Sequence, residues 1–176
     1  MNPHINAIEV PIHSSIMKQL QRADFYDSYE MKIEHRGRSA LDIYLQMIAK
    51  TPVWVNFLMS VRNRIVLIFG LKNLGKLTEI HQSLGESGYQ VGERVGIFTL
   101  LSVTDDEVIL GDSDKHLDVK VSICKLDNGN QNSIAVTTVV HIHNLPGRVY
   151  MFFVIPMHRL IVPAILERSY LANTHV

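Results

Sequence analysis

Apolar residues change their spacing along the first fifty positions, and this change predicts a strand followed by a helix. Residues 24–35 partly alternate between apolar and polar side chains and include aromatic residues, which favours a strand whose apolar face carries Asp27 as an exception. From Ser39 onward, apolar side chains recur every three or four positions, as on the buried stripe of a helix. Asp42 stands three places after Ser39, which is the spacing of a capping box at a helix start.

A second helix is expected directly after the first, because Thr51 can cap a helix and Pro52 suits its first turn. Seven apolar side chains are expected on its inward face: Val53, Trp54, Phe57, Leu58, Val61, Ile65 and Ile68. Residues 70–92 are the least regular part of the chain, with one short helix expected around 77–84.

Between residues 95 and 143 the apolar period becomes two and β-branched residues dominate, which predicts strands. Four strands are expected, at 95–103, 107–110, 116–126 and 133–143. The links between them are short and rich in turn residues, so consecutive strands must run antiparallel. Because apolar and polar residues alternate in 116–126, one face of the sheet is expected to be buried and the other solvated.

A long apolar helix is expected from Pro146 to about Leu171. One of its faces carries Val149, Phe152, Phe153, Pro156, Leu160 and Pro163. Further apolar residues spread over the other sides, so the helix is expected to be buried on more than one side. Pro156 and Pro163 lie two turns apart and should bend the helix in the same direction, which suits a curved sheet.

The order of these elements is a strand, a helix pair, four antiparallel strands and a long final helix. This order indicates an α+β fold with helices on one face of an antiparallel sheet. It is also the order of the helix-grip fold, in which a curved antiparallel sheet wraps around a long C-terminal helix and a cavity lies between them. No repeat or linker divides the chain, so residues 1–176 are expected to form a single domain with its core at about 23–171.

Composition narrows the classes of function. The 176 residues hold 17 Lys and Arg and 17 Asp and Glu, and this formal net charge of +0 excludes a strongly basic nucleic-acid binder. The single cysteine, Cys124, excludes an intramolecular disulfide and a cysteine zinc site and fits a reducing compartment. The N-terminus lacks a basic start followed by an apolar run, so we expect no secretory signal and a cytoplasmic location.

Two apolar stretches, residues 52–71 and 145–166, have the length of a membrane span. Arg62 and Arg64 lie at the centre of the first, and Arg159 interrupts the second. An arginine at the centre of a spanning helix costs about 2.5–3.5 kcal/mol on insertion. Neither stretch is therefore expected to span a bilayer, whereas peripheral contact with lipid stays open.

Three parts of the sequence carry a resemblance to a known family. They are Thr51-Pro52-Val53-Trp54 with Arg62-Asn63-Arg64 and Phe69-Gly70-Leu71-Lys72; Gly111-Asp112 with Lys115-His116-Leu117-Asp118; and residues 137–166, with His141, Asn144, Gly147-Arg148, Tyr150, Pro156, His158-Arg159 and Pro163. Together they resemble an uncharacterised bacterial family, the domain of unknown function 2867, over roughly residues 23–170. The resemblance implies a fold similar to START and birch-pollen-allergen-like helix-grip proteins, with a cavity for a hydrophobic ligand. It implies no catalytic residue, because the family has no established activity.

His116 and Asp118 are candidate site residues, either at the mouth of that cavity or as a structural pair. With Asp112 and Asp114 they alternate along the chain and could offer ligands to a metal ion. Ligands two positions apart on a strand lie about 7 Å apart, however, which is too far for one ion without a bend. We therefore expect no metal and no cofactor.

His141 is a third candidate, because it shares a strand face with Thr137 and Val139 that could line the concave side of the sheet. The alternative is a hydrogen-bonded histidine at the sheet edge. Residues 70–77 match the G-x-x-x-x-G-K pattern of a phosphate-binding loop, but Leu77 occupies the position of the Mg²⁺-binding hydroxyl. A helix exit bounded by glycines is therefore the better interpretation.

Phe153 and Arg159 are candidate ligand contacts on the final helix. A charge inside an apolar helix must reach water or find a partner, so Arg159 could orient the polar end of a ligand or form a structural ion pair. The acidic residues considered as structural partners for this helix are Asp112, Asp118 and Glu167.

Three hypotheses of function follow. The first is a non-enzymatic module that binds a small hydrophobic or lipid-like ligand in the cavity between sheet and helix. The second is a cavity enzyme of the cyclase or hydrolase type that would use His116, Asp118, His141 and Arg159. The third is a homo-oligomeric interaction protein, such as a homodimer formed through the excess apolar helix surface.

Overall fold

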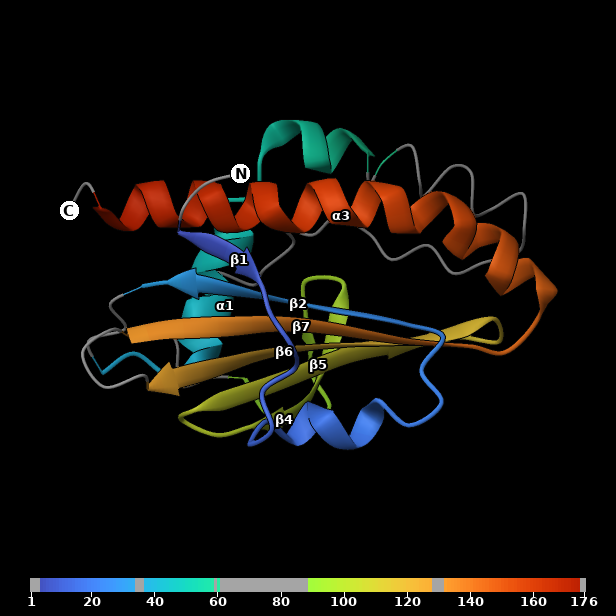
Figure 1. Ribbon diagram of the computed structural model, residues 1–176, viewed down its shortest axis with the longest axis horizontal. Coiled ribbons are helices and arrows are strands. Elements are labelled where there is room, and N and C mark those ends of the chain that lie inside the picture. Colours follow the sequence, from blue (N-terminus) through green and yellow to red (C-terminus); the bar gives the residue numbers. More distant parts are fainter. Residues whose placement is uncertain (1–3, 34–36, 59, 61–88, 128–131, 175–176) are drawn as a thin grey trace.

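The chain forms a seven-stranded antiparallel sheet with a long C-terminal helix over one of its faces (Figure 1). The computed structural model describes residues 4–33, 37–58, 60, 89–127 and 132–174. In the sheet, the strands follow the order β1-β2-β7-β6-β5-β4-β3. The strands are β1 (Ile5–Ala7), β2 (Phe25–Lys32), β3 (Arg94–Val95), β4 (Phe98–Val103), β5 (Glu107–Ser113), β6 (Leu117–Asp127) and β7 (Asn132–Ile142). The described helices are the 3-10 helix η1 (Ser15–Gln19), α1 (Ala40–Ala49) and α3 (Leu145–Thr174), and residues 53–58 are also helical.

This arrangement confirms the predicted α+β class and its helix-grip-like layout. The four strands expected between residues 95 and 143 are present, with the first of them divided into β3 and β4. The capping box of α1 is confirmed too, because the Ser39 hydroxyl accepts the Asp42 N–H at 3.1 Å and the Asp42 carboxylate accepts the Ser39 N–H at 2.9 Å.

Strand β2 lies in the interior of the sheet, between β1 and β7. Its odd-numbered residues Phe25, Asp27, Tyr29 and Met31 lie opposite Val140, Thr138, Val136 and Ile134 of β7. These residues belong to the inner face of the sheet, which is the face that α3 covers. The even-numbered residues of β2 point to the other side, called the outer face below.

The main core fills the space between the inner face and the helices α1 and α3. Met31, Leu110, Ile123 and Ile134 contribute from the strands, and Leu166 contributes from α3. From α1, six residues are buried against it: Ala40, Leu41, Ile43, Tyr44, Met47 and Ile48.

The prediction that the second face of the sheet is solvated was wrong for its centre. The segment around η1 lies on the outer face, on the opposite side of the sheet from α3 (Figure 1). Ile16 and Val10 pack there against Val139 of β7 in a second apolar cluster. Neither η1 nor β1 was predicted, because short elements of three to five residues carry little periodicity.

The inward face predicted for the second helix was wrong for three of its described residues. Val53 and Phe57 are 80% and 67% exposed, and Trp54 is exposed as well. The buried residue is Val55, which packs with Ile97. The predicted inward residues Val61, Ile65 and Ile68 lie outside the described residues, as do the glycine pattern at 70–77 and the short helix at 77–84.

Helix α3 presents two different apolar faces. Met151 and Leu166 are buried towards the sheet, with Val154 and Ile161 beside them over the inner face. The face that carries Val149, Phe152, Phe153 and Leu160 is exposed instead, so the expected burial on more than one side was wrong for this face. Pro156 and Pro163 both lie inside the continuous helix.

Candidate functional site

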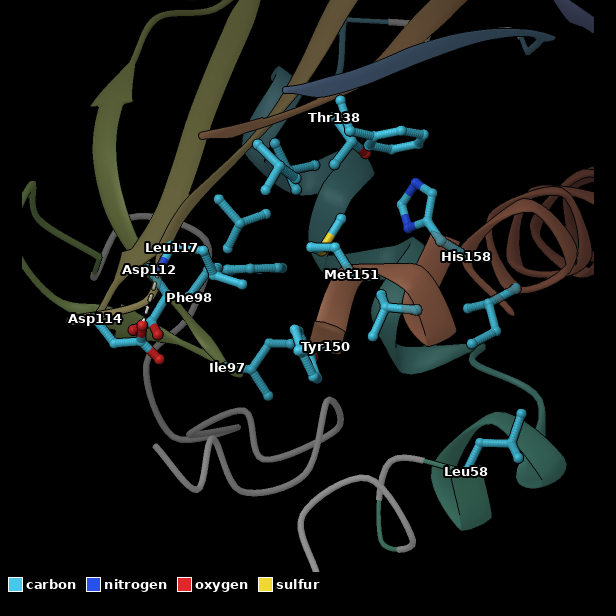
Figure 2. A pocket seen from close by; sticks show the side chains of 16 residues that line it. Leu58, Ile97, Phe98, Asp112, Asp114, Leu117, Thr138, Tyr150, Met151 and His158 are labelled. Carbon is cyan, nitrogen blue, oxygen red and sulfur yellow. Dashed lines mark hydrogen bonds between the residues drawn. The ribbon is translucent and has the colours of Figure 1, made fainter. Parts of the chain in front are cut away.

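A cavity of about 200 Å³ lies between the inner face of the sheet and α3 (Figure 2). The strands contribute Val119, Val121 and Val140 to its wall, and α3 contributes Met151, Val154 and Ile161. Most of the lining is apolar because the inner faces of β6 and β7 carry one β-branched residue after another.

Five polar side chains also line the cavity: Asp112, Asp114, Thr138, Tyr150 and His158. Figure 2 shows Asp112 and Asp114 on one side of the cavity, and Thr138 and His158 on another. Asp112 forms an ion pair with Arg94 at 3.4 Å. Asp114 Oδ1 accepts the backbone N–H groups of His116 and Leu117 at 2.7 and 3.0 Å, so this carboxylate stabilises the turn between β5 and β6.

His158 is held in a defined orientation by β2. Its Nε2 lies 3.1 Å from Asp27 Oδ1, and the two side chains are only 19% and 15% exposed. The ring of Phe25 meets the His158 ring edge-on, with 5.6 Å between their centroids. The second carboxylate oxygen of Asp27 is buried without a hydrogen-bond partner among the described residues. The histidine that lines the cavity is therefore paired with Asp27, and its ring is fixed from two sides.

The Asp27 carboxylate also acts on Tyr29, two positions further along β2. Burial, followed by the nearby Asp27 carboxylate, raises the pKa of Tyr29, and the Arg159 charge opposes this rise only in part. Tyr29 follows Asp27 on the same face of β2, so the field of this carboxylate reaches along the inner face.

Sequence reasoning missed this pair, although a signal was present. Asp27 is the one acidic residue on the apolar face of its strand, and His158 interrupts an apolar helix. Two polar residues on two apolar faces that pack together are natural partners. The acidic partners expected for the helix, Asp112, Asp118 and Glu167, do not include the residue that His158 contacts.

His116 lies at the junction between the sheet and α3. Its Nδ1 lies 2.9 Å from Asn144 Oδ1, which also accepts the N–H of Gly147 at 3.2 Å in the first turn of the helix. Asn144 Nδ2 in turn donates to the carbonyl of Lys115 at 2.8 Å. His116 is buried, and its Nε2 has no hydrogen-bond partner in the described part of the chain. This arrangement supports the structural interpretation of His116.

Asp118 and His141 lie opposite each other on β6 and β7, on the outer face. Asp118 accepts hydrogen bonds from Ser113 and, at 3.1 Å, from His143 Nε2. Burial alone would raise the pKa of Asp118, but these hydrogen bonds and the nearby positive charges outweigh it and lower the pKa. His141 Nε2 lies 3.2 Å from the carbonyl of Gln21. The expectation that the His141 face lines the concave side was wrong, because the register turns it away from α3.

Phe153 and Arg159 lie on the exposed side of α3. None of the five predicted ligand-binding residues (His116, Asp118, His141, Phe153 and Arg159) is among the described residues that line the cavity. The four residues proposed for the cavity enzyme do not meet in one cavity either. Among the described residues no group of three or more His, Cys, Asp and Glu side chains is placed to hold a metal ion.

Comparison with known proteins gives one match. A family model described as "Protein of unknown function (DUF2867)" covers residues 19–165. The matched segment includes the whole cavity wall from Phe25 to Ile161. No curated protein and no solved structure matches the chain.

Proposed function

Since this chain belongs to the DUF2867 family of proteins of unknown function, we propose a function from its cavity: it binds a small apolar molecule between the sheet and α3. The observation that carries the proposal is the apolar space between Val119, Val121, Val140 and the side chains of α3. Protein interiors are normally packed without such gaps, because an empty cavity of this size destabilises the folded state. A ligand that fills the cavity restores the missing contacts.

The volume of the cavity limits the size of the ligand. A water molecule takes about 30 Å³ in the liquid, and a dry cavity of ~150 Å³ is large enough for benzene. A cavity of about 200 Å³ therefore suits a molecule of roughly seven to ten non-hydrogen atoms. A whole lipid would have to leave most of its chain outside, so a compact apolar ligand is the better candidate.

The first experiment is native mass spectrometry of freshly purified protein, followed by thermal unfolding with added toluene. We expect either a co-purifying small molecule or a midpoint of unfolding that rises with toluene concentration, because a ligand that binds only the folded state stabilises it.

A cavity-filling variant tests the location. Val121→Phe places a ring in the cavity and occupies the space that toluene needs, so toluene should no longer raise the midpoint of unfolding of this variant. The matched control is Val103→Phe on the exposed side of β4, which should bind toluene like the unaltered protein. Equal binding by the two variants would place the ligand elsewhere and reject the proposal.

Several finer properties complete this proposal. We propose that the protein is related to START and birch-pollen-allergen-like helix-grip proteins. We also propose that it acts in the bacterial cytoplasm, binds no nucleic acid and has no catalytic activity. The layout of the sheet and α3, the single cysteine and the balanced charge support this placement.

A second candidate function is attachment to an anionic membrane surface through the exposed face of α3. The stretch Leu145–Ala172 is long and apolar enough by length and composition to cross a membrane, yet only 11% of its most apolar part is buried. Phe152 and Phe153 are 74% and 65% exposed. Arg148 and Arg159 are exposed on the same helix, and no salt bridge joins them to a described residue. Each basic residue near an anionic surface contributes about 1 kcal/mol, so these charges complement such a membrane.

Vesicle flotation tests this second function. We expect the protein to float with phosphatidylglycerol vesicles, to float less with phosphatidylcholine vesicles, and to lose binding in the double variant Phe152→Ser/Phe153→Ser. Tyr26→Ser changes an exposed aromatic residue on the outer face of β2 and serves as the control. No flotation, together with a dimer in sedimentation, would instead assign the face to a second copy of the chain.

A further inference from the structure

We infer that the cavity selects apolar molecules whose polar end donates a hydrogen bond, such as an alcohol or an amine, and that Nδ1 of His158 accepts this bond. This inference rests on the proposed function, because it names the class of ligand for the same cavity. It starts from His158, which lines the cavity and is paired with Asp27.

The contact with Asp27 determines which nitrogen of His158 carries the proton. An ionised carboxylate can only accept hydrogen bonds, so Nε2 of His158 must donate to Asp27 Oδ1 across their 3.1 Å contact. In a neutral imidazole the other nitrogen then has a lone pair and accepts. The tautomer that presents an acceptor at Nδ1 is therefore imposed by β2.

The position of the ring directs this acceptor to the ligand. Figure 2 shows the His158 ring projecting from α3 towards the cavity, near Thr138 and Met151. The hydrogen bond of the His158 ring to the described residues is made through Nε2, so no described residue takes up Nδ1. Phe25 holds the ring edge-on, so turning it away from the cavity would break both this contact and the bond to Asp27.

The charged side chains in the cavity wall itself disfavour a carboxylate ligand. Asp112 and Asp114 lie in the wall, and Arg94 is already paired with Asp112. Even a protonated His158 would only balance Asp27, so the pair would offer no net positive charge to an anion. A carboxylate buried here would lose its hydration, and the His158–Asp27 pair would supply no free positive charge to compensate for this loss. An alcohol carries no charge, and an ammonium group that loses its hydration faces the carboxylates of Asp112 and Asp114 in the wall instead of a like charge.

A matched set of small aromatic ligands tests this inference. Toluene, benzyl alcohol, benzylamine and benzoate share one ring and differ in the polar end. Their affinities are measured at pH 8 by calorimetry or by ligand-observed NMR. We expect benzyl alcohol and benzylamine to bind about threefold to tenfold more tightly than toluene, because one additional hydrogen bond contributes a net binding free energy of this size. Benzoate should bind most weakly.

The variants assign the effect to His158. His158→Phe should remove the advantage of the alcohol over toluene, and His141→Phe on the outer face is the matched control. Because His158→Phe leaves the Asp27 carboxylate without its partner, the double variant Asp27→Leu/His158→Phe is measured as well, since removal of both partners is much less destabilising. The double variant should bind toluene and benzyl alcohol equally.

Different results would overturn the inferred class of ligand and the proposed binding function of the cavity. If toluene binds but benzoate binds as tightly as benzyl alcohol, the inference about the polar end is overturned while the cavity function stands. The inference is overturned in the same way if the double variant keeps the preference for the alcohol. If none of the four ligands binds the unaltered protein, the proposed function itself is rejected.

Discussion

Glu107 shows how a single buried charge connects two parts of the molecule. It lies on the outer face of β5 and is almost fully buried. Ser122 donates to Oε1 at 2.6 Å, Ser14 donates to the same oxygen, and the N–H of Ser15 donates to Oε2 at 2.7 Å. Burial alone would raise the pKa of Glu107, but these hydrogen bonds outweigh it and the net pKa is lowered. The carboxylate therefore attaches the start of η1 to the sheet.

The lowered pKa of Glu107 predicts a loss of stability in acid. A carboxyl group whose pKa is lower in the folded than in the unfolded state stabilises the fold above its unfolded pKa, and this stability is lost as the pH falls through the folded pKa. Glu107→Gln should lower the free energy of unfolding by about 1–3 kcal/mol at pH 7, and this free energy should then fall less steeply as the pH drops below 4.5. Urea unfolding at several pH values measures both effects.

The control for this prediction is Glu9→Gln, which changes an exposed carboxylate in the same N-terminal part of the chain. It should unfold like the unaltered protein. If Glu107→Gln is no less stable than Glu9→Gln at pH 7, the carboxylate is not what attaches η1.

Individual residues were the hardest to predict from the sequence. Asp118 and His141 were predicted as site residues because polar side chains alternate on their strands. The same alternation is found on a sheet face that points away from α3, and both residues lie on that face. Asp27 and His158 lie far apart in the sequence and meet only because β2 and α3 pack together. Local spacing contains no information about such a contact, whereas a polar residue on an apolar face does signal that a partner is needed.

At the scale of single elements, the start of α3 is fixed by a close approach to the turn between β5 and β6. Asn144 caps the helix, and Gly147 lies against the carbonyl oxygen of His116. A side chain at position 147 would also meet Ile142 at 2.9 Å. Glycine is therefore required at position 147, because a side chain there would collide with the backbone of His116. Backbone cannot move aside as a flexible side chain can.

Gly147→Ala tests this contact. Alanine favours a helix over glycine by about 1 kcal/mol, so a gain in stability would be expected if there were space. We expect a net loss of about 1–3 kcal/mol instead, because the new methyl group collides with the His116 carbonyl. Thermal or urea unfolding measures the change. Arg148→Ala, at the exposed neighbouring position, should have little effect, and a more stable Gly147→Ala protein would contradict the close approach.

Elements with strong local signals were predictable. Ser39 and Asp42 determine the start of α1 within one turn, and alternating β-branched residues determine β6 and β7. The helical segment at 53–58 was predicted as a helix but with the wrong residues inward, because Val53 and Phe57 are apolar and nevertheless exposed. Apolar character marks the buried side of a helix only when the opposite side is polar.

At the scale of the whole molecule, the consecutive strands β4 to β7 follow from their short links, and this part of the topology was predictable. The position of β2 was not, because one of its two neighbours is β7, which lies far from it in the sequence. The packing of η1 on the outer face was not predicted for the same reason. This packing depends on a few contacts between distant residues, such as that of Ile16 with Val139. Both features depend on contacts between distant parts of the chain.

The pairing of β2 with β7 also determines the order in which the protein can assemble during its synthesis. Ser28 and Thr137, which share a 2.9 Å hydrogen bond, are 109 positions apart. At a translation rate of ~5–20 residues per second, β2 must wait on the order of ten seconds for its partner strand to be made. During this time the edge of β2 that will pair with β7 stays open, whereas β4 to β7 can pair as soon as each hairpin leaves the ribosome. Strand β2 is thus made early and paired late, and during this interval a nascent chain of this topology needs protection from aggregation.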